Sequence, residues 1–510
     1  MKKIALSVFA ICILHSYLFY GNRWGISVVL FTMALMALFI YSLKDKENIK
    51  NKKALLLSIP ITLISLSYGL FNNIFFKITN FFVIIGLTCI MLIWAIYGEF
   101  NITSIISNTV IFIFKPVIYI PEAVKLIISS VFGKNQNNIS NDTNKEKISE
   151  NKVIKQILSG LIISIPLLIV ILALLMSADT VFAQILEPIK EFVLNIFNLG
   201  FWFSVYFRII VFSIVCIYIM AFVCNILKSN TENMQKTNSK GLNMQNITVN
   251  TVLTILNIVY LLFVIVQFTH LFTQIGQGDE IYYADYARKG FFQLMIVTFI
   301  NFAIILITNA NKIETTMFTN IYTKIMNLFL IIFTAILIFS SFVRMYIYEQ
   351  QFGYTFLRLL VYFILITELI LIIPTIVYVF NKKIKLLKCY IVIFAVMYTL
   401  ANFVNVDKTI ARKNVDRYIA NVELVSDKQK SEIDFNYLRR LSTDAIPDII
   451  RLYNKTKDKI LKEEIKIHLD WQYQKTENDN EKLPEFNFQK ENSKRLLQKW
   501  NLTKQWQKSL

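Results

Sequence analysis

The stretch TFLRLLVYFILITELILIIPTIVYVF, residues 355–380, contains only two charged side chains, Arg358 and Glu368. An α-helix needs about 20 mainly apolar residues to cross the hydrocarbon core of a bilayer, because the core is roughly 30 Å thick and each residue adds about 1.5 Å. The stretch is long enough and apolar enough to do so. It is therefore predicted to form a membrane-spanning helix.

Apolar runs of this kind recur along most of the chain. The 510 residues are 55% hydrophobic and 17% charged, against about 25% charged in an ordinary soluble domain. The sequence lacks the alternating runs of about ten residues that mark a β-barrel. It predicts an all-α fold, a polytopic transmembrane helix bundle of about 11 spans with a small C-terminal helical domain. The spans are expected near residues 4–20, 26–43, 54–71, 78–97, 153–176, 201–227, 251–272, 290–308, 325–347, 355–380 and 389–403.

Polar segments divide these runs into four expected units. Residues 1–132 would hold the first four spans and, from residue 101 on, an interfacial or re-entrant segment whose apolar pieces are too short to cross. The Asn- and Lys-rich residues 133–152 would form a flexible cytoplasmic linker. Residues 153–403 would hold spans five to eleven, and residues 404–510 an extracytoplasmic helical domain. Its helices are expected near 434–441, 443–453, 457–471 and 493–506.

The net charge of +19 raises the question of a nucleic-acid partner. A nucleic-acid-binding protein gathers its basic residues on one soluble face, whereas here they fall into short loops between apolar runs. In that position Lys and Arg orient a membrane protein, with the richer loops inside. Their distribution predicts a multi-pass cell-membrane protein with a cytoplasmic N-terminus and an extracytoplasmic C-terminal domain, and no nucleic-acid partner.

Two charged residues, Arg208 and Glu368, lie well inside predicted spans rather than near their ends. A charge at the centre of a membrane helix costs roughly 2.5–3.5 kcal/mol unless it is paired or hydrated. Such residues are candidates for a transport pathway. Alternatively, they form a structural pair or a polar tie between helices, and Arg208 can also extend its guanidinium towards the interface.

A second group of charges lies in two predicted outer loops. Arg344, Glu349 and Arg358 surround the loop between spans nine and ten, and Asp285 and Arg288 lie in the loop between spans seven and eight. These five residues are expected to meet at one membrane surface. There they would bind an anionic lipid headgroup or a peptide, or form a salt-bridge lattice that locks the helices together.

The sequence contains no signature of a cofactor, metal or catalytic site. It has no P-loop, HExxH, GxSxG or EF-hand pattern. Its three histidines, His15, His270 and His468, are far apart, so a histidine metal site is not expected. Its five cysteines lie in or beside apolar runs and form no CxxC pair. No cofactor, no metal and no catalytic residue are therefore predicted.

Four motifs resemble those of a known family. They are YADYARKGFFQL at 283–294, RMxxY at 344–348 with FGYTxLR at 352–358, DxxYLxxLSxDAxP at 434–447, and WNL at 500–502. In this order they resemble a bacterial family of polytopic membrane proteins of unknown function, domain-of-unknown-function family 4173 or its close relative 4153. The resemblance runs from about residue 252 to the C-terminus, with signature region 279–294. It implies a fold and no activity.

Three functions from different classes remain open on the sequence alone. The first is a non-enzymatic component of sensing, assembly or envelope maintenance, in which a protein partner binds the C-terminal domain. The second is a transporter or flippase with Glu368 and Arg208 in its pathway, for which Pro60, Pro166 and Pro374 would break the helices. The third is a membrane transferase that uses Asp285 or Glu349.

Overall fold

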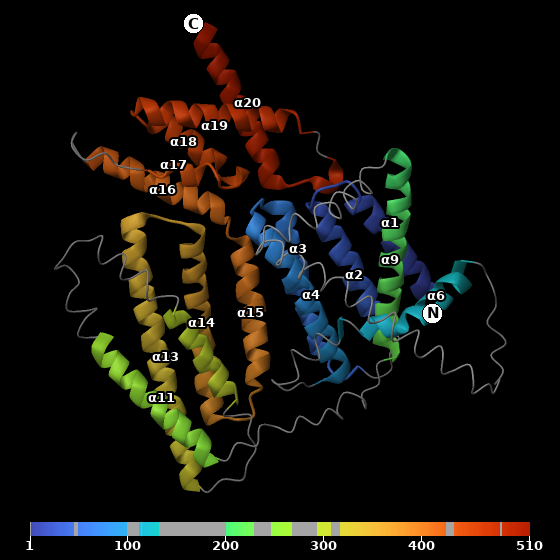
Figure 1. Ribbon diagram of the computed structural model, residues 1–510, viewed down its shortest axis with the longest axis vertical. Helices are drawn as coiled ribbons and strands as arrows, with labels where there is room; N and C mark the ends of the chain where they lie inside the picture. The colour runs from blue at the N-terminus through green and yellow to red at the C-terminus, as the bar shows by residue number, and fades with distance from the viewer. Residues whose placement is uncertain are drawn as a thin grey trace, which may run out of the picture.

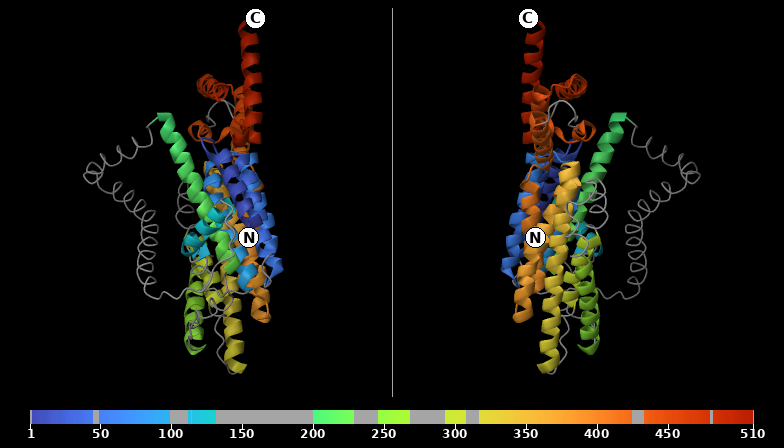
Figure 2. Two further views of the ribbon diagram at one scale, coloured as in Figure 1. Left: turned by 90° about the vertical axis from the view of Figure 1, so that its right-hand side faces the viewer. Right: turned by 90° about the vertical axis from the view of Figure 1, so that its left-hand side faces the viewer.

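The computed structural model describes residues 2–44, 49–98, 112–113, 115–131, 200–228, 246–267, 293–307, 317–424, 433–479 and 482–509. Every regular element within these residues is a helix. The helices form an elongated bundle with a layer of C-terminal helices across one end, here called the upper end (Figure 1). The two side views place that layer over the same end of the bundle (Figure 2).

The first helix group comes from the N-terminal part of the chain. It contains α1 (Lys2–Phe19), α2 (Ile26–Lys44), α3 (Ser58–Leu70), α4 (Ile74–Tyr97) and α9 (Gly200–Lys228). A short 3₁₀ helix, η1 (Lys52–Leu57), leads directly into α3. Pro60, expected to interrupt the third span, therefore lies in the first turn of α3, where a missing N–H breaks no helical hydrogen bond.

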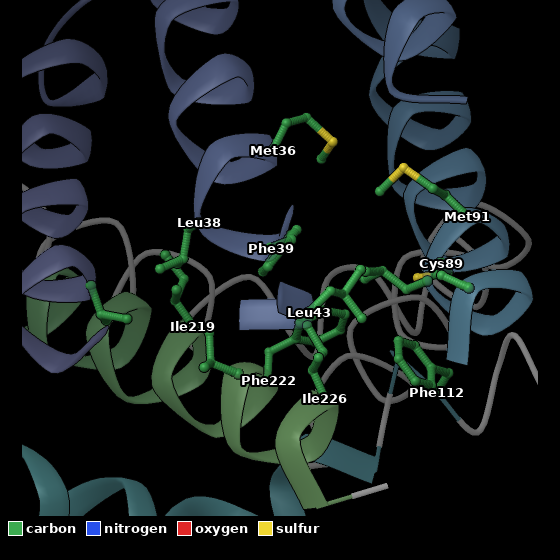
Figure 3. Packing of buried hydrophobic residues seen from close by; sticks show 14 of the residues in the cluster. Met36, Leu38, Phe39, Leu43, Cys89, Met91, Phe112, Ile219, Phe222 and Ile226 are labelled. Carbon is green, nitrogen blue, oxygen red and sulfur yellow. The ribbon is translucent and has the colours of Figure 1, made fainter. Parts of the chain in front are cut away.

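The core of this group is closed by residues from distant parts of the chain. Met36, Phe39 and Leu43 of α2 lie near Met91 of α4 and Phe222 of α9 (Figure 3). Phe39 and Phe222 have ring centroids 5.2 Å apart. Since lipid supplies little hydrophobic driving force between helices, close packing of this kind is what holds a membrane bundle together.

One short helix, α6 (Ile120–Val131), follows the 3₁₀ helix η2 (Lys115–Tyr119) and runs crosswise to α9 (Figure 1). Its 12 residues extend over about 18 Å, less than the hydrocarbon thickness. The interfacial segment expected here lies partly outside the described residues. Its assignment stays a prediction, and α6 is compatible with it.

The second helix group contains α11 (Asn246–Gln267), the helix Gln293–Ile307, α13 (Met317–Phe352), α14 (Phe356–Phe380) and α15 (Leu386–Phe403). It has a hydrophobic core of its own. The helix α15 also packs against α3 and so joins the two groups. At that contact, Ser67 of α3 donates to Asn402 of α15 at 3.1 Å, and Asn80 of the neighbouring α4 donates to the same Asn402 oxygen at 2.6 Å.

The C-terminal layer contains α16 (Val406–Leu424), α17 (Phe435–Leu438), α18 (Ile446–Lys455), α19 (Lys459–Glu477) and α20 (Phe488–Ser509). Two 3₁₀ turns, η4 (Thr443–Ala445) and η5 (Leu483–Glu485), precede α18 and α20. A third core holds these helices together. The expected helix at 434–441 is shorter than predicted, because Asp434 caps it and the chain turns after Leu438.

The all-α membrane fold predicted from the sequence is confirmed. Seven helices among the described residues are long and apolar enough to cross a membrane. Three shorter apolar helices occupy the positions of the expected first, seventh and eighth spans. The expected span at 153–176, with Pro166, lies outside the described residues, as do the linker 133–152 and most of the signature region. The chain is thus a multi-pass membrane protein.

Candidate functional site

The turn between α13 and α14 lies at the upper end and carries three of the predicted site residues. Arg344, Glu349 and Arg358 are all buried, with 5%, 5% and 8% of their surfaces exposed. The Glu349 carboxylate accepts a hydrogen bond of 2.9 Å from the Tyr362 hydroxyl. All three charged side chains are therefore enclosed by the protein, and the Glu349 carboxylate already has a hydrogen-bond partner there.

Arg358 closes this turn from below. Its guanidinium donates to the carbonyl oxygens of Phe352, at 2.8 Å, and Gly353, and it lies 4.2 Å from the centre of the Tyr348 ring. Gly353 adopts φ +74°, and an added Cβ would lie 2.6 Å from Oδ1 of Asn414. The turn therefore requires glycine for its backbone angle and for its close approach to α16.

Helices of the C-terminal layer cover the same turn from above. Asn414 of α16 donates to the Tyr354 carbonyl at 2.8 Å and accepts from the Tyr354 N–H at 2.9 Å. Arg417 donates to the Glu349 carbonyl at 3.2 Å, and the Tyr437 hydroxyl accepts from the Phe356 N–H at 2.8 Å. Hydrogen bonds thus attach the α13–α14 turn to α16 and α17, while the salt-bridge lattice and the binding role expected for these residues stay predictions.

Glu368 lies between helices of the second group and is fully buried. Its Oε1 accepts a hydrogen bond of 2.8 Å from the hydroxyl of Thr298, in the helix Gln293–Ile307. One turn away, Asn301 donates to Thr334 of α13 at 3.0 Å. Glu368 thus belongs to a polar layer that ties three helices together.

Arg208 belongs to the other helix group and meets different partners. Its Nε donates to the Ser16 hydroxyl of α1 at 2.8 Å, and its guanidinium lies 4.9 Å from the centre of the Tyr20 ring. It is exposed and close to the upper end of α1, as an arginine that extends its charge to the interface would be. Arg208 and Glu368 therefore do not form a pair.

Asp285 and Arg288 lie outside the described residues. The structure therefore gives no position for them relative to Arg344, Glu349 and Arg358. The meeting of the two outer loops stays a prediction.

A second polar region at the upper end was not predicted from the sequence. It joins the turn between α3 and α4 to the C-terminal layer. The N–H of Asn72 donates to Oδ2 of Asp444 at 3.2 Å, and Asn73 donates to Oδ1 of Asp407 at 2.9 Å. Asp407 also accepts from the N–H of Ser442 at 3.2 Å. Two buried carboxylates of the C-terminal layer thus hold the α3–α4 turn.

Burial raises the pKa of Asp444 to about 6. The hydrogen bond from Asn72 and the Lys77 ammonium oppose this rise, and the negative charge of Asp407 adds to it. A carboxyl group with such a pKa changes its charge near neutral pH, unlike an ordinary aspartate.

Residues just before α20 bind the N-terminal helices at two further points. The Phe486 carbonyl accepts a hydrogen bond of 3.1 Å from the N–H of Ile26 and so caps the start of α2. Asn487, only 2% exposed, donates to the carbonyls of Tyr68 at 2.9 Å and Phe71 at 2.8 Å. A Cβ on Gly25 would lie 2.6 Å from the Glu485 carbonyl, so only glycine allows this approach.

A cavity of about 170 Å³ opens between these contacts, here called the junction cavity. Asp479 at its wall accepts hydrogen bonds from Arg23 at 2.8 Å and Lys490 at 2.9 Å. The hydrogen bond from Lys490 and the nearby Arg23 lower the pKa of Asp479. The cavity is lined by Arg23, Trp24, Asn72, Lys77, Thr443, Gln472, Lys475, Thr476, Asp479, Glu485, Asn487 and Lys490.

Among the described residues, no group of three or more His, Cys, Asp or Glu side chains is placed to hold a metal ion. Glu349 and Glu368, the acids expected from the sequence, are both buried and hydrogen-bonded.

Sequence reasoning missed the junction because its residues belong to unremarkable turns. Asp444 stands near a helix start and Arg23 and Trp24 in a short loop, and no motif marks either place in the sequence. The adjacent Asn72 and Asn73, between two apolar runs, were the available signal. Nothing in the sequence indicated which distant segment they would meet.

Comparison with protein families gives one result. The sequence model of a family described as "Domain of unknown function (DUF4153)" matches residues 58–452, and the chain belongs to this family. The family is the second of the two that the motifs resemble, and the match begins well before residue 252. No curated protein and no solved structure matches the chain.

Proposed function

We propose that this member of the DUF4153 family is a non-enzymatic membrane component that acts in sensing, assembly or envelope maintenance through a protein partner. Membership in a family of unknown function supplies no activity, so the proposal depends on geometry. The observation that carries it is the outer face of α19, which leaves an apolar stripe uncovered on a domain that is held firmly to the membrane bundle.

The stripe consists of Ile460, Ile467 and Trp471, which are 72%, 62% and 53% exposed. Their spacing places them along one side of the helix. In Figure 1, α19 lies in the layer above α16, beyond the end of the apolar helices of the bundle. Exposed apolar side chains grouped in this way favour a protein interaction.

The charges beside the stripe favour one kind of partner. Glu463 and Glu464 lie near its first residue, and Lys475 lies beyond its last. An amphipathic helix with an apolar face would pack on the stripe as helices do in recognition grooves. Basic residues at one end and an acidic residue at the other would fix its direction. The proposed partner is a protein that presents such a helix.

The attachment of the C-terminal domain to both helix groups supports a role in presenting the α19 stripe to a partner. Asn414 and Arg417 hold it to the second helix group, while Asp407 and Asn487 hold it to the first. Attachment at separate points limits rotation of α19 relative to the membrane. A partner bound to the stripe would be held at a fixed distance from the membrane bundle. A conformational change in either helix group would be transmitted to it.

The transporter and transferase alternatives receive less support. Glu368 is buried and its Oε1 accepts a hydrogen bond from Thr298, and Arg208 belongs to the other helix group. Glu349 is buried under the C-terminal layer. The transferase alternative with Asp285 depends on a residue outside the described part of the chain.

The lysine distribution supports an orientation for this arrangement. The loops expected on the N-terminal side carry most of the lysines, which favours a cytoplasmic N-terminus and an outer position for the C-terminal domain. A reporter that is active only in the cytosol, fused after Leu510, is expected to stay inactive. A reporter that is active only outside should give signal at the same position.

The partner proposal is tested by placing a photo-crosslinking residue at position 467 in living cells. We expect one protein adduct, mapped to an amphipathic helix of the partner, and its loss in the Glu464→Lys variant. A crosslinker at Gln498, which is exposed on α20, is the control and should give no such adduct. Equal adducts at both positions, insensitivity to Glu464→Lys, or an adduct only with a second copy of this chain would overturn the proposal.

A further inference from the structure

The junction cavity carries an excess of positive charge, and the partner surface on α19 uses only one of its cations, Lys475. Four cations line it and two carboxylates oppose them: Arg23, Lys77, Lys475 and Lys490 against Asp479 and Glu485. Two of these cations come from the membrane bundle and two from the C-terminal domain. We propose that the cavity binds the phosphate group of an anionic lipid headgroup.

Asp479 prepares two of these cations for an anion. It accepts hydrogen bonds from Arg23 at 2.8 Å and from Lys490 at 2.9 Å; Lys490 is mostly buried and so held in place before a ligand arrives, while the Arg23 side chain stays 69% exposed. Each cation has further N–H donors beyond the one given to Asp479. Charge-assisted hydrogen bonds from Arg and Lys to phosphate oxygens are among the strongest that proteins form. Preorganisation reduces the entropy lost on binding.

Lys77 adds a third cation to the lining of the cavity. Its ammonium donates to Oδ1 of Asn72 at 2.6 Å, and Asn72 in turn bonds Asp444 and Thr443 of the C-terminal layer. A phosphate in the cavity would therefore bridge the bundle and the domain. Binding at such a junction stabilises the docked arrangement over any state in which the two parts separate.

The size of the cavity limits what it accepts. Its volume is about 170 Å³. Pockets for drug-sized ligands are about 300–1,000 Å³. A phosphate group with a few further atoms fits the junction cavity, whereas a nucleotide does not.

The surroundings favour a lipid as the source of the phosphate. Trp24, in the cavity wall, is 43% exposed and stacks on Phe81 of α4, a position typical of tryptophan at a membrane interface. Phe486 and Phe488, next to the cavity residues Glu485 and Asn487, are 40% and 55% exposed. These rings would contact the glycerol and acyl region while the phosphate enters the cavity.

The proposal is tested by native mass spectrometry of the full chain with phosphatidylglycerol, phosphatidylcholine and inorganic phosphate as separate probes. We expect phosphatidylglycerol to be retained at least tenfold more than phosphatidylcholine. The variant Arg23→Gln/Lys77→Gln should lose this preference. The matched control Lys459→Gln/Lys462→Gln removes two cations of α19 outside the cavity and should keep it.

Three results would overturn the proposal. The first is unchanged phosphatidylglycerol retention in Arg23→Gln/Lys77→Gln, with helicity and elution volume equal to those of the original chain. The second is equal loss in the control variant. The third is saturable binding of inorganic phosphate without any preference for the anionic lipid, which would assign the cavity to a free anion. None of these variants alters the stripe on α19, so this test and that of the partner proposal fail independently.

Discussion

At the turn between α13 and α14, Arg344, Glu349 and Arg358 are directed inward and covered by α16. At the junction of the C-terminal layer with α2, α3 and α4, by contrast, cations surround a cavity of about 170 Å³. Both regions lie at the upper end and both hold the same domain. The comparison indicates that charged residues close together in the sequence can serve to close a turn, whereas residues from distant segments of the chain form the site that has room for a ligand.

The largest effect is expected where backbone meets backbone at the junction. Gly25→Leu would place a side chain against the Glu485 and Phe486 backbone, from which a Cβ is already only 2.6–2.7 Å away. Overpacking of this kind should cost about 3 kcal/mol of stability and release η5 from α2. Thermal unfolding of the purified chain measures the cost, and protease cleavage near residue 485 reports the release.

Gly86 supplies the control for this substitution. It lies within α4 with nothing within 4 Å of an added Cβ, so Gly86→Ala should be neutral or stabilise by about 0.5–1 kcal/mol. If Gly25→Leu unfolds at the same temperature as Gly86→Ala and resists protease equally, the close contact at α2 is wrong.

A somewhat smaller loss is expected at the other region from Gly353→Ala. The residue has φ +74°, and the new Cβ would also meet Asn414 at 2.6 Å. The backbone angle alone costs about 1–2 kcal/mol, and the contact with Asn414 should add to it. The sum is measured as a shift in the unfolding midpoint.

Gly21→Ala separates the two contributions. Gly21 has φ +70° but nothing within 4 Å of a Cβ, so it should show the backbone cost only. Equal losses at Gly21 and Gly353 would mean that α16 does not press on the α13–α14 turn, and the locking interpretation of that region would fail.

The next prediction concerns pH at the junction. Because the pKa of Asp444 is about 6 in the folded chain, against 3.8 ordinarily, the folded state binds this proton more tightly than the unfolded chain. Stability from this group should rise as the pH falls from 7 towards 4, and be lost as the pH rises through 6. Asp444→Asn should flatten that part of the stability–pH curve.

Asp479 gives the opposite sign at the same junction. Lys490 and Arg23 lower its pKa, so its contribution is present at neutral pH and is lost as the pH falls through the lowered value. Asp479→Asn should therefore abolish the loss of stability that Asp479 causes at acidic pH. The increase in stability due to Asp444 as the pH falls should remain. A curve for Asp444→Asn that is identical to that of the original chain would show that Asp444 is not buried at this contact.

These cases show what the sequence could provide. The apolar run at 355–380 predicted a span, and α14 occupies Phe356–Phe380, because run length and helix rise are local properties. Burial of Arg358 and Glu349 was not foreseeable, since α16 covers their turn through Asn414 and Arg417, which lie 60 and 68 positions after Tyr354 and Glu349. The contact of Asn72 with Asp444 bridges 372 positions, and a single sequence carries no information on such pairings.

The smallest effect is expected inside the membrane. Glu368→Gln keeps an acceptor for the Thr298 hydroxyl, bonded at 2.8 Å, and removes an acid from a fully buried position. The variant should be as stable as the original chain or more so, by up to about 1 kcal/mol, and should complement a deletion strain fully. Normal stability with complete loss of complementation would instead favour transport through Glu368.

The central claim is that the C-terminal domain is fixed on the N-terminal helices as well as on its neighbours in sequence. It is tested most directly by disulfide crosslinking of the Asn72→Cys/Thr443→Cys variant, made in a chain whose native cysteines have been replaced and measured in cell membranes. In the original chain, Nδ2 of Asn72 and Oγ1 of Thr443 are 3.3 Å apart. A Tyr354→Cys/Asn414→Cys pair at the other region is the positive control. We predict that both pairs crosslink within one chain. Crosslinking of the control pair alone would contradict the account.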